Sequence, residues 1–138
     1  MKRVLILGSS GFIGGALVKK MYSENFKVSV VLRDFSKASY ISRFKNVNIN
    51  YFNLDNKGEL IKEIQKNDVI INCIHDFGNQ KFNLNLVTNI CDTISETNKQ
   101  LIHISTISTY QPFIKKNHIN ENTDLDKNTF QYAKNKNE

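Results

Sequence analysis

The residues best suited to proton-transfer chemistry are a tyrosine and a lysine near the end of the sequence, Tyr132 and Lys136. A free phenol titrates near pH ~10, too high for proton exchange at neutral pH unless a positive charge stabilises the phenolate. Residues four apart on a helix share one face, so the Lys136 ammonium would stand beside the Tyr132 hydroxyl. In a chain this rich in lysine, a Tyr-x-x-x-Lys pair alone is weak support for an active site.

A second candidate is the glycine-rich stretch after the first apolar run, Gly8-Ser9-Ser10-Gly11-Phe12-Ile13-Gly14. Gly8 permits a sharp turn, Gly11 lets a pyrophosphate approach the backbone, and Gly14 lets the next helix lie close to the strand. The helix N-terminus then offers free N–H groups and a positive dipole to phosphates. Because it stands between an apolar strand and an amphipathic helix, this stretch predicts a phosphate-binding turn.

The elements that must position these residues follow from the apolar pattern. Apolar runs alternate with segments of helical period, which is typical of repeated βα units and of a parallel sheet covered by helices. We expect strands at 2–7, 28–32, 47–52, 68–73 and 101–105, buried on both faces, and helices at 11–24, 36–44, 57–66 and 82–97. The sequence therefore predicts an α/β fold, a doubly wound parallel (Rossmann) sheet in the order 3-2-1-4-5, which binds its ligand where the order reverses between strands 1 and 4.

Two helices carry an apolar stripe that should face the sheet. The stripe residues are Ile13, Leu17 and Met21 in the first helix, and Leu86, Ile90 and Ile94 in the last. A long polar stretch, 106–128, contains the only proline, Pro112, and is expected to be a functional loop. A further helix is expected from about Thr129, but the chain stops at Glu138 before it reaches a usual length. We therefore expect residues 1–138 to form a single domain that is incomplete at its C-terminus.

The GSSGFIG spacing resembles the extended and atypical short-chain dehydrogenase/reductases, the group that contains nucleoside-diphosphate-sugar epimerases, dehydratases and reductases. The resemblance covers essentially all 138 residues. It implies that a nicotinamide dinucleotide contacts the turn through Gly8, Ser10, Gly11, Phe12, Ile13 and Gly14. It also implies further strands and a smaller C-terminal region, beyond this sequence, that would make most of the substrate contacts.

The end of the second strand distinguishes NAD from NADP in this family. An acidic residue there binds the ribose 2′-hydroxyl of NAD, whereas this sequence has Leu32 at that place and Arg33 next. An arginine can pair with a 2′-phosphate, so the resemblance implies NADP in preference to NAD, with Lys37 as a second phosphate contact. Two alternatives stay open: Arg33 as an ordinary surface residue, and Asp34 as the ribose ligand if the register is shifted.

Other positions agree with the family less closely. Asn53 and Leu54 stand where an Asp and an aliphatic residue usually lie beside the adenine, and an Asn carbonyl can still accept from an amino group. After the fourth strand the family shows an alanine-rich turn against the cofactor, whereas Ile74 and His75 stand here. We still expect Ile74 to contact the cofactor, whereas the resemblance gives His75 no role. Asn89 matches an Asn that supports the sheet, although a polar helix residue is an equal interpretation.

The fifth strand runs into Ser105-Thr106-Ile107-Ser108-Thr109-Tyr110, which resembles the family's SSxxVYG turn with Thr106 at the catalytic Ser/Thr place. The order of glycine turn, Ser/Thr turn and Tyr-x-x-x-Lys matches the family as a whole. The resemblance implies that Tyr132 exchanges the proton at the substrate hydroxyl or carbonyl, that Thr106 hydrogen-bonds the same oxygen, and that Lys136 also binds the nicotinamide ribose. Surface positions on a lysine-rich terminal helix are the alternative for Tyr132 and Lys136.

Composition excludes several other classes. With 40% hydrophobic and 23% charged residues the chain is expected to be a soluble, cytoplasmic globular protein without a signal peptide or membrane span. The net charge of +6 comes mostly from dispersed lysines, whereas a nucleic-acid groove reader concentrates arginines, so no nucleic acid is expected. Cys73 and Cys91 have no metal-ligand spacing, so neither a zinc site nor a disulfide framework is expected, and both should be core or half-buried.

The resemblance leaves three functions open. The first is an NAD(P)-dependent epimerase, dehydratase or reductase whose partner is a small-molecule substrate, a nucleotide sugar or related carbonyl compound, with a homodimer through helices of this domain as an expectation. The second is a non-catalytic NADP-binding sensor, which the altered alanine turn favours. The third is an RNA-binding Rossmann derivative, whose binding would weaken steeply with salt.

Overall fold

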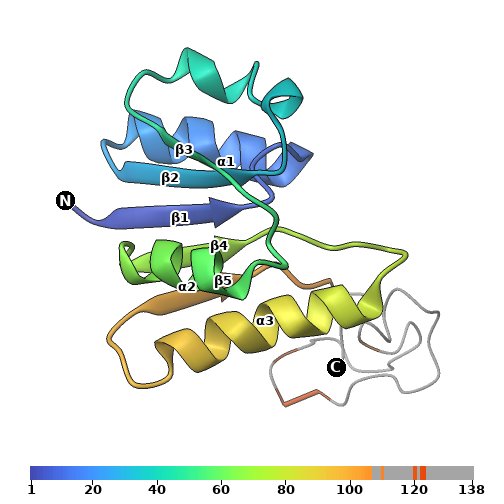
Figure 1. Ribbon diagram of the computed structural model, residues 1–138. Helices are drawn as coiled ribbons and strands as arrows, with labels where there is room; N and C mark the ends of the chain where they lie inside the picture. The colour runs from blue at the N-terminus through green and yellow to red at the C-terminus, as the bar shows by residue number, and fades with distance from the viewer. Residues whose placement is uncertain (107–109, 111–119, 121, 124–138) are drawn as a thin grey trace. The chain divides into compact units, whose positions relative to one another are not determined.

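The computed structural model describes residues 1–106, 110, 120 and 122–123. Five strands form one parallel sheet in the order β3-β2-β1-β4-β5, which confirms the predicted doubly wound topology (Figure 1). The strands are β1 (Arg3–Leu7), β2 (Lys27–Leu32), β3 (Asn48–Tyr51), β4 (Val69–Asn72) and β5 (Gln100–His103). The helices are α1 (Phe12–Ser23), α2 (Lys57–Gln65) and α3 (Gln80–Ile94), with short 3₁₀ turns η1 (Phe35–Lys37) and η2 (Ile41–Arg43).

The chain divides into two compact units, residues 1–104 and 105–138. The first contains the whole sheet and its helices. In the second, the described residues include a turn in which the Thr123 amide donates to the Asn120 carbonyl at 3.0 Å. The Asn120 amide in turn donates to Thr123 Oγ1 at 3.0 Å. The helix expected from Thr129 and most of the expected loop lie outside the described residues.

Two apolar clusters hold the sheet between its helices. On one face Val18 of α1 and Ile41 of η2 cover alternate residues of β1, β2 and β4. On the other face Leu60 and Ile64 of α2, with Leu86 and Ile90 of α3, cover the remaining alternate residues (Figure 1). The stripe predicted for the last helix is thus confirmed. The inner strands are buried on both faces, whereas the outer strands β3 and β5 are partly exposed.

The predicted apolar face of the first helix is confirmed for Leu17 and Met21, which pack against the core, and wrong for Ile13. The buried residues of this helix are Gly14, Gly15 and Val18, whereas Ile13 is 48% exposed. A Cβ on Gly14 would lie 2.2 Å from the Gly8 carbonyl oxygen. Because only a glycine permits this approach, α1 lies on the sheet with its glycine face, and the Ile13 side chain turns outward.

A single helix over 36–44 is also wrong, because the structure has two 3₁₀ turns there. The apolar residues of this segment, Phe35, Ala38, Ile41 and Phe44, recur every three residues. That spacing matches the three residues per turn of a 3₁₀ helix better than the 3.6 of an α-helix. Ile41 reaches the core, and Phe44 contacts the Tyr22 and Tyr40 rings.

Of the two cysteines, Cys73 is half-buried as expected, but Cys91 is exposed, which corrects the prediction for that residue. It lies on α3 between positions that face the sheet, on the outer side of the helix. Among the described residues, none of the helices combines the length and the apolar character that a membrane crossing requires.

Candidate functional site

A groove of about 790 Å³ opens at the carboxyl ends of the strands, within the size range of small-molecule and cofactor sites. Seven of the residues predicted to contact a cofactor line it: Gly8, Ser10, Arg33, Lys37, Asn53, Leu54 and Ile74. A smaller hollow of about 410 Å³ shares Ser10 and Lys37 with the groove and is lined in addition by Gly11 and Phe12. The structure thus brings together residues that lie far apart in the sequence.

The glycine turn forms the groove's inner end. Gly8 has a φ of +83°, a conformation that L-residues with side chains rarely adopt, and its carbonyl accepts from the Gly11 amide at 3.0 Å. α1 then begins at Phe12, and its N-cap residue is Gly11, which has no side chain to cap the helix. Its first N–H groups have no acceptor within the helix, so they are available to an anion. Two predicted contacts, Ile13 and Gly14, line neither cavity.

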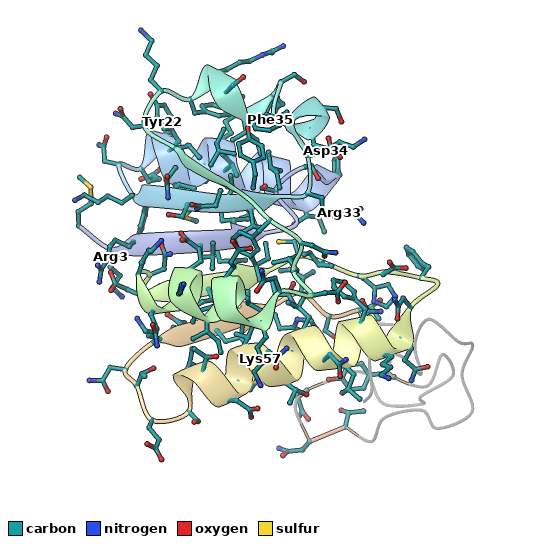
Figure 2. All side chains as sticks on the ribbon, in the orientation of Figure 1. Arg3, Tyr22, Arg33, Asp34, Phe35 and Lys57 are labelled. Atoms are coloured by element: carbon teal, nitrogen blue, oxygen red, sulfur yellow. The ribbon has the colours of Figure 1, made fainter. Side chains whose placement is uncertain are left out.

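Arg33 and Asp34 follow β2 at the outer part of the groove, at the carboxyl ends of the strands (Figure 2). Arg33 is exposed. The Asp34 carboxylate accepts from the Ser36 amide at 2.8 Å and from the Ser36 hydroxyl, so it caps η1. The hydroxyl bond is the main cause that holds the pKa of Asp34 below its usual value. Asp34 is therefore already engaged by its own chain, whereas Lys37 lines the groove beside Arg33.

The opposite wall contains Asn53 and Leu54, just after β3. Leu54 is 8% exposed and belongs to the core, so only part of its side chain reaches the groove. Asn53 is exposed, and its Oδ1 accepts from the Asp55 amide at 3.3 Å. An apolar side chain beside an exposed amide is a surface that suits a flat heterocycle with amino groups.

The loop after β4 forms the third wall and is fixed by asparagines. Asn72, 1% exposed, accepts from the Ile74 amide at 3.0 Å. The Asn83 side chain makes two hydrogen bonds to the backbone of Asp76. Its Oδ1 accepts from the Asp76 amide at 2.8 Å, and its Nδ2 donates to the Asp76 carbonyl at 2.7 Å. Asn79 caps α3 by accepting from the Phe82 amide at 3.0 Å. This wall therefore has a defined shape.

Several lining residues were not predicted, namely His75, Asp76, Phe77, Gly78, Asn79 and Phe82. Phe77 is 77% exposed, and its ring meets the His75 ring edge-on at 4.8 Å. Asn79 carries a readable signal, a capping residue before a helical run. The exposed Phe77 carries no periodic signal. Beside the groove, burial raises the pKa of the half-buried Cys73 thiol.

The part of the chain that the structure describes does not bring the predicted catalytic residues together. Thr106 is half-buried and belongs to the second unit, while Tyr132 and Lys136, the latter also a predicted cofactor contact, lie outside the described residues. In the described part of the chain, no group of three or more His, Cys, Asp or Glu side chains could hold a metal ion.

A second groove, of about 760 Å³, opens at the amino ends of the strands. Arg3 and Tyr22 line it, and Figure 2 shows both at the end of the sheet opposite Arg33. The Arg3 guanidinium is paired with Asp68 at 2.8 Å, and Lys66 is paired with Glu63 at 2.9 Å. Glu63 is buried, and its Oε1 has no hydrogen-bond partner among the residues that the structure describes.

One family model matches nearly the whole chain. The model of the "NAD dependent epimerase/dehydratase family" matches residues 4–138. A dTDP-glucose 4,6-dehydratase from Bacillus anthracis in complex with NAD is similar with a TM-score of 0.81 and 20% identity, over 99% of this chain and 47% of that one. A UDP-glucose-4-epimerase from Stenotrophomonas maltophila with bound NAD gives 0.75 and 16%, over 99% and 46%.

The PbgP3 protein from Burkholderia pseudomallei gives a TM-score of 0.77 and 21% identity, over 99% of this chain and 51% of that one. At these identities the likeness shows the fold. This chain spans about half the length of these three structures. No match was found among the curated proteins.

Proposed function

This chain belongs to the NAD-dependent epimerase/dehydratase family, and from that premise we propose that its carboxyl-end groove binds a nicotinamide dinucleotide, NADP in preference to NAD. The observation that carries the proposal is the continuity of the groove. It runs from the Gly8 turn, past Ile74 and the Asn53-Leu54 wall, to Arg33. The uncapped start of α1 suits the pyrophosphate, and the space that Gly14 leaves lets that helix start approach the turn.

The preference for NADP rests on Arg33. Its exposed guanidinium lines the groove together with Lys37, and an arginine can hold a 2′-phosphate with two parallel hydrogen bonds. Asp34, the alternative ribose ligand, is already engaged by Ser36. A 2′-phosphate would place two negative charges near Arg33 and Lys37. The ribose of NAD carries no such charge, so it would leave the two positive side chains uncompensated.

The test is a fluorescence titration of the chain with NADPH and with NADH, repeated with Arg33→Ala. We expect saturable binding that favours NADPH, and a loss of about 10- to 100-fold in NADPH affinity in the variant, the size of a hydrogen bond to a charged group. NADH affinity should change little. The matched control is Arg43→Ala, an arginine of the same β2–β3 connection that contacts the Tyr40 ring and does not line the groove.

Two results would count against the proposal. If neither dinucleotide binds, the groove is not a cofactor site in this chain and the enzyme proposal falls with it. If binding occurs but Arg33→Ala keeps the full preference for NADPH, the assignment of Arg33 is wrong while the cofactor site stands.

We further propose that the chain contributes to an NAD(P)-dependent epimerase, dehydratase or reductase acting on a nucleotide sugar or related carbonyl compound. The bound nicotinamide would supply or accept hydride. Tyr132 would exchange the proton at the substrate hydroxyl or carbonyl, Lys136 would stabilise its phenolate and bind the nicotinamide ribose, and Thr106 would hydrogen-bond the reacting oxygen. Support comes from the family match over residues 4–138 and from the order of the three motifs.

Tyr132→Phe tests this part, with UDP-glucose and dTDP-glucose as the first substrates, the oxidised dinucleotide as cofactor, and chromatographic conversion of the sugar nucleotide as the readout. The variant should keep NADPH affinity and lose turnover, by about 100-fold or more.

A cofactor-binding sensor is the second candidate, favoured by Ile74 and His75 in the place of the usual alanines. A sensor would show neither turnover nor any effect of Tyr132→Phe.

A further inference from the structure

One buried side chain links the glycine turn to the fifth strand. Asn72 ends β4 and lies, in register, between Leu7 of β1 and His103 of β5. Its Oδ1 accepts from the Ile74 amide at 3.0 Å, and its Nδ2 lies 3.2 Å from His103 Nδ1. Its backbone carbonyl accepts from the Ile104 amide at 3.0 Å. A polar side chain at 1% exposure thus has partners on both sides.

These partners fix the proton positions. The backbone N–H of Ile74 can only donate, so the Asn72 atom that faces it is the oxygen, and the amide NH₂ faces His103. An NH₂ group can only donate, so His103 Nδ1 must accept. This pairing therefore requires a neutral imidazole with its proton on Nε2. Protonation at Nδ1 would set two donors against each other.

The same bonds reach the groove through Ile74. The Ile74 side chain lies against the glycine turn, since a Cβ on Gly8 would meet its Cγ1 at 3.0 Å. Ile74 and Gly8 both line the carboxyl-end groove. A continuous set of contacts therefore runs from His103 through Asn72 and Ile74 to Gly8.

We propose that Asn72 and His103 are a pair of positioning residues that hold the Ile74 wall of the groove against the glycine turn, and that the pair works only while His103 is neutral. The proposal rests on the proposed function, because the groove it shapes is the one assigned to the dinucleotide. Protonation of His103 would remove the acceptor that orients Asn72, so dinucleotide binding should be weaker at acidic pH.

Other titratable groups stand on the elements packed against β5. α3 carries Lys81, Cys91 and Asp92, and the loop after β4 carries His75 and Asp76. At the far end of β4, Asp68 is paired with Arg3. Of these, only His75 shares the pH range of an imidazole, between about pH 5 and pH 8. It also lines the groove, so an experiment must separate it from His103.

The pair itself is tested on the wild-type chain without cofactor, by ¹⁵N NMR of the histidine rings and of the Ile74 amide. We expect the Nε2–H tautomer for His103 at about pH 8, and an Ile74 amide shift that titrates with the same midpoint as that ring. An Nδ1–H tautomer, or an Ile74 amide indifferent to His103, would overturn the proposal. This readout does not depend on whether the groove binds a cofactor.

The positioning role is tested by NADH titrations at about pH 8 and about pH 5.5. NADH is the probe because it lacks the 2′-phosphate, which itself titrates in this range. Wild-type affinity should fall about three- to tenfold at the lower pH, the worth of one hydrogen bond. His103→Asn, whose side-chain oxygen can replace Nδ1 as the acceptor, should bind equally at both pH values. His75→Asn should keep the wild-type pH dependence.

The two failures are distinguishable. If the NMR result holds but NADH and NADPH bind at neither pH, the proposed function is wrong. If NADH binds and its pH dependence survives in His103→Asn, or disappears in His75→Asn, the positioning role of the pair is wrong.

Discussion

Two grooves of nearly equal volume, about 790 Å³ and about 760 Å³, open at opposite ends of the same sheet. At the carboxyl end, the groove is built around a glycine turn and an uncapped helix start, so that backbone N–H groups are available to a ligand. At the amino end, two of the charged side chains, Arg3 and Lys66, are already paired within the chain. Volume therefore does not distinguish the two grooves, whereas the backbone N–H groups at the start of α1 lie at the carboxyl end.

The asymmetry follows from the parallel topology. Every βα connection leaves the sheet at the carboxyl end, so the loops after β1, β2, β3 and β4 meet there. The amino end receives only the ends of helices and the turns that return to the strands. Residues at this second groove should therefore affect stability and leave cofactor affinity unchanged, and the following predictions test that separation.

The largest effect is expected for Gly14→Ala. Its Cβ would lie 2.2 Å from the Gly8 carbonyl oxygen and 2.9 Å from Ser9 Cα, both backbone atoms that cannot move without opening the turn. We expect a loss of about 3 kcal/mol in the free energy of unfolding, measured by urea denaturation, together with loss of NADPH binding. Gly58→Ala is the control, because the nearest atom is Asn56 Oδ1 at 3.6 Å. A Gly14→Ala variant as stable as the control would contradict the close approach.

A smaller change, of opposite sign, is expected at the amino end for Glu63→Leu. The carboxylate is buried next to Leu60 and Ile64, and Lys66, its partner, is mostly exposed. An apolar side chain should raise the free energy of unfolding by about 1 kcal/mol, because burial of the charge is no longer required. Gln65→Leu, at an exposed position of the same helix, should have almost no effect.

Calorimetry of these two variants with NADPH completes the comparison. Neither should change the affinity, since neither residue lines the carboxyl-end groove. A weaker affinity in Glu63→Leu alone would break the separation and give the amino-end groove a part in ligand binding.

The smallest effect is expected for the exposed Arg3–Asp68 pair. The Arg3 side-chain hydrogen bond is the main cause that lowers the pKa of Asp68 from 3.8 to about 2. The stabilisation of the fold by the Arg3–Asp68 pair should therefore be complete above pH 3.8 and disappear as the pH falls through about 2. NMR titration of the carboxyl group should show this pKa, and Arg3→Ala should return it toward 3.8. An unchanged pKa in the variant would exclude Arg3 as the cause.

Much of the fold could be predicted from the sequence because continuous runs of Val, Ile and Leu indicate buried strands. Those runs predicted the strands and the glycine spacing predicted the turn, and the strand order is that of the doubly wound fold which alternating strands and helices indicate. Apolar periodicity predicted Leu17 and Met21 on the inner face of α1 but misplaced Ile13, because the close contact of α1 with the turn belongs to Gly14, a residue without a side chain. The helix expected at 36–44 was wrong because the apolar residues there recur every three residues, a spacing that suits the two 3₁₀ turns of the structure.

Residues predicted from their place next to a strand end come together in the structure, while their contact with a cofactor stays a prediction. Gly8, Arg33, Asn53 and Ile74 all line the groove. Asn72 was not recognised as a positioning residue, although a polar side chain at the end of the apolar run Val69–Asn72 is a signal of its own. Its partner His103 lies 31 residues away, and only the register of β4 and β5 brings the two together.

The most direct test of the account is a map of backbone amide shifts when ¹⁵N-labelled chain is titrated with NADPH. We predict the largest shifts at Gly8, Ser10, Gly11, Arg33 and Ile74, and no shifts at Tyr22, Asn48 and Lys66 at the amino end. Shifts that gather at the amino-end residues, or no saturable shifts at all, would contradict the assignment of the carboxyl-end groove as the dinucleotide site.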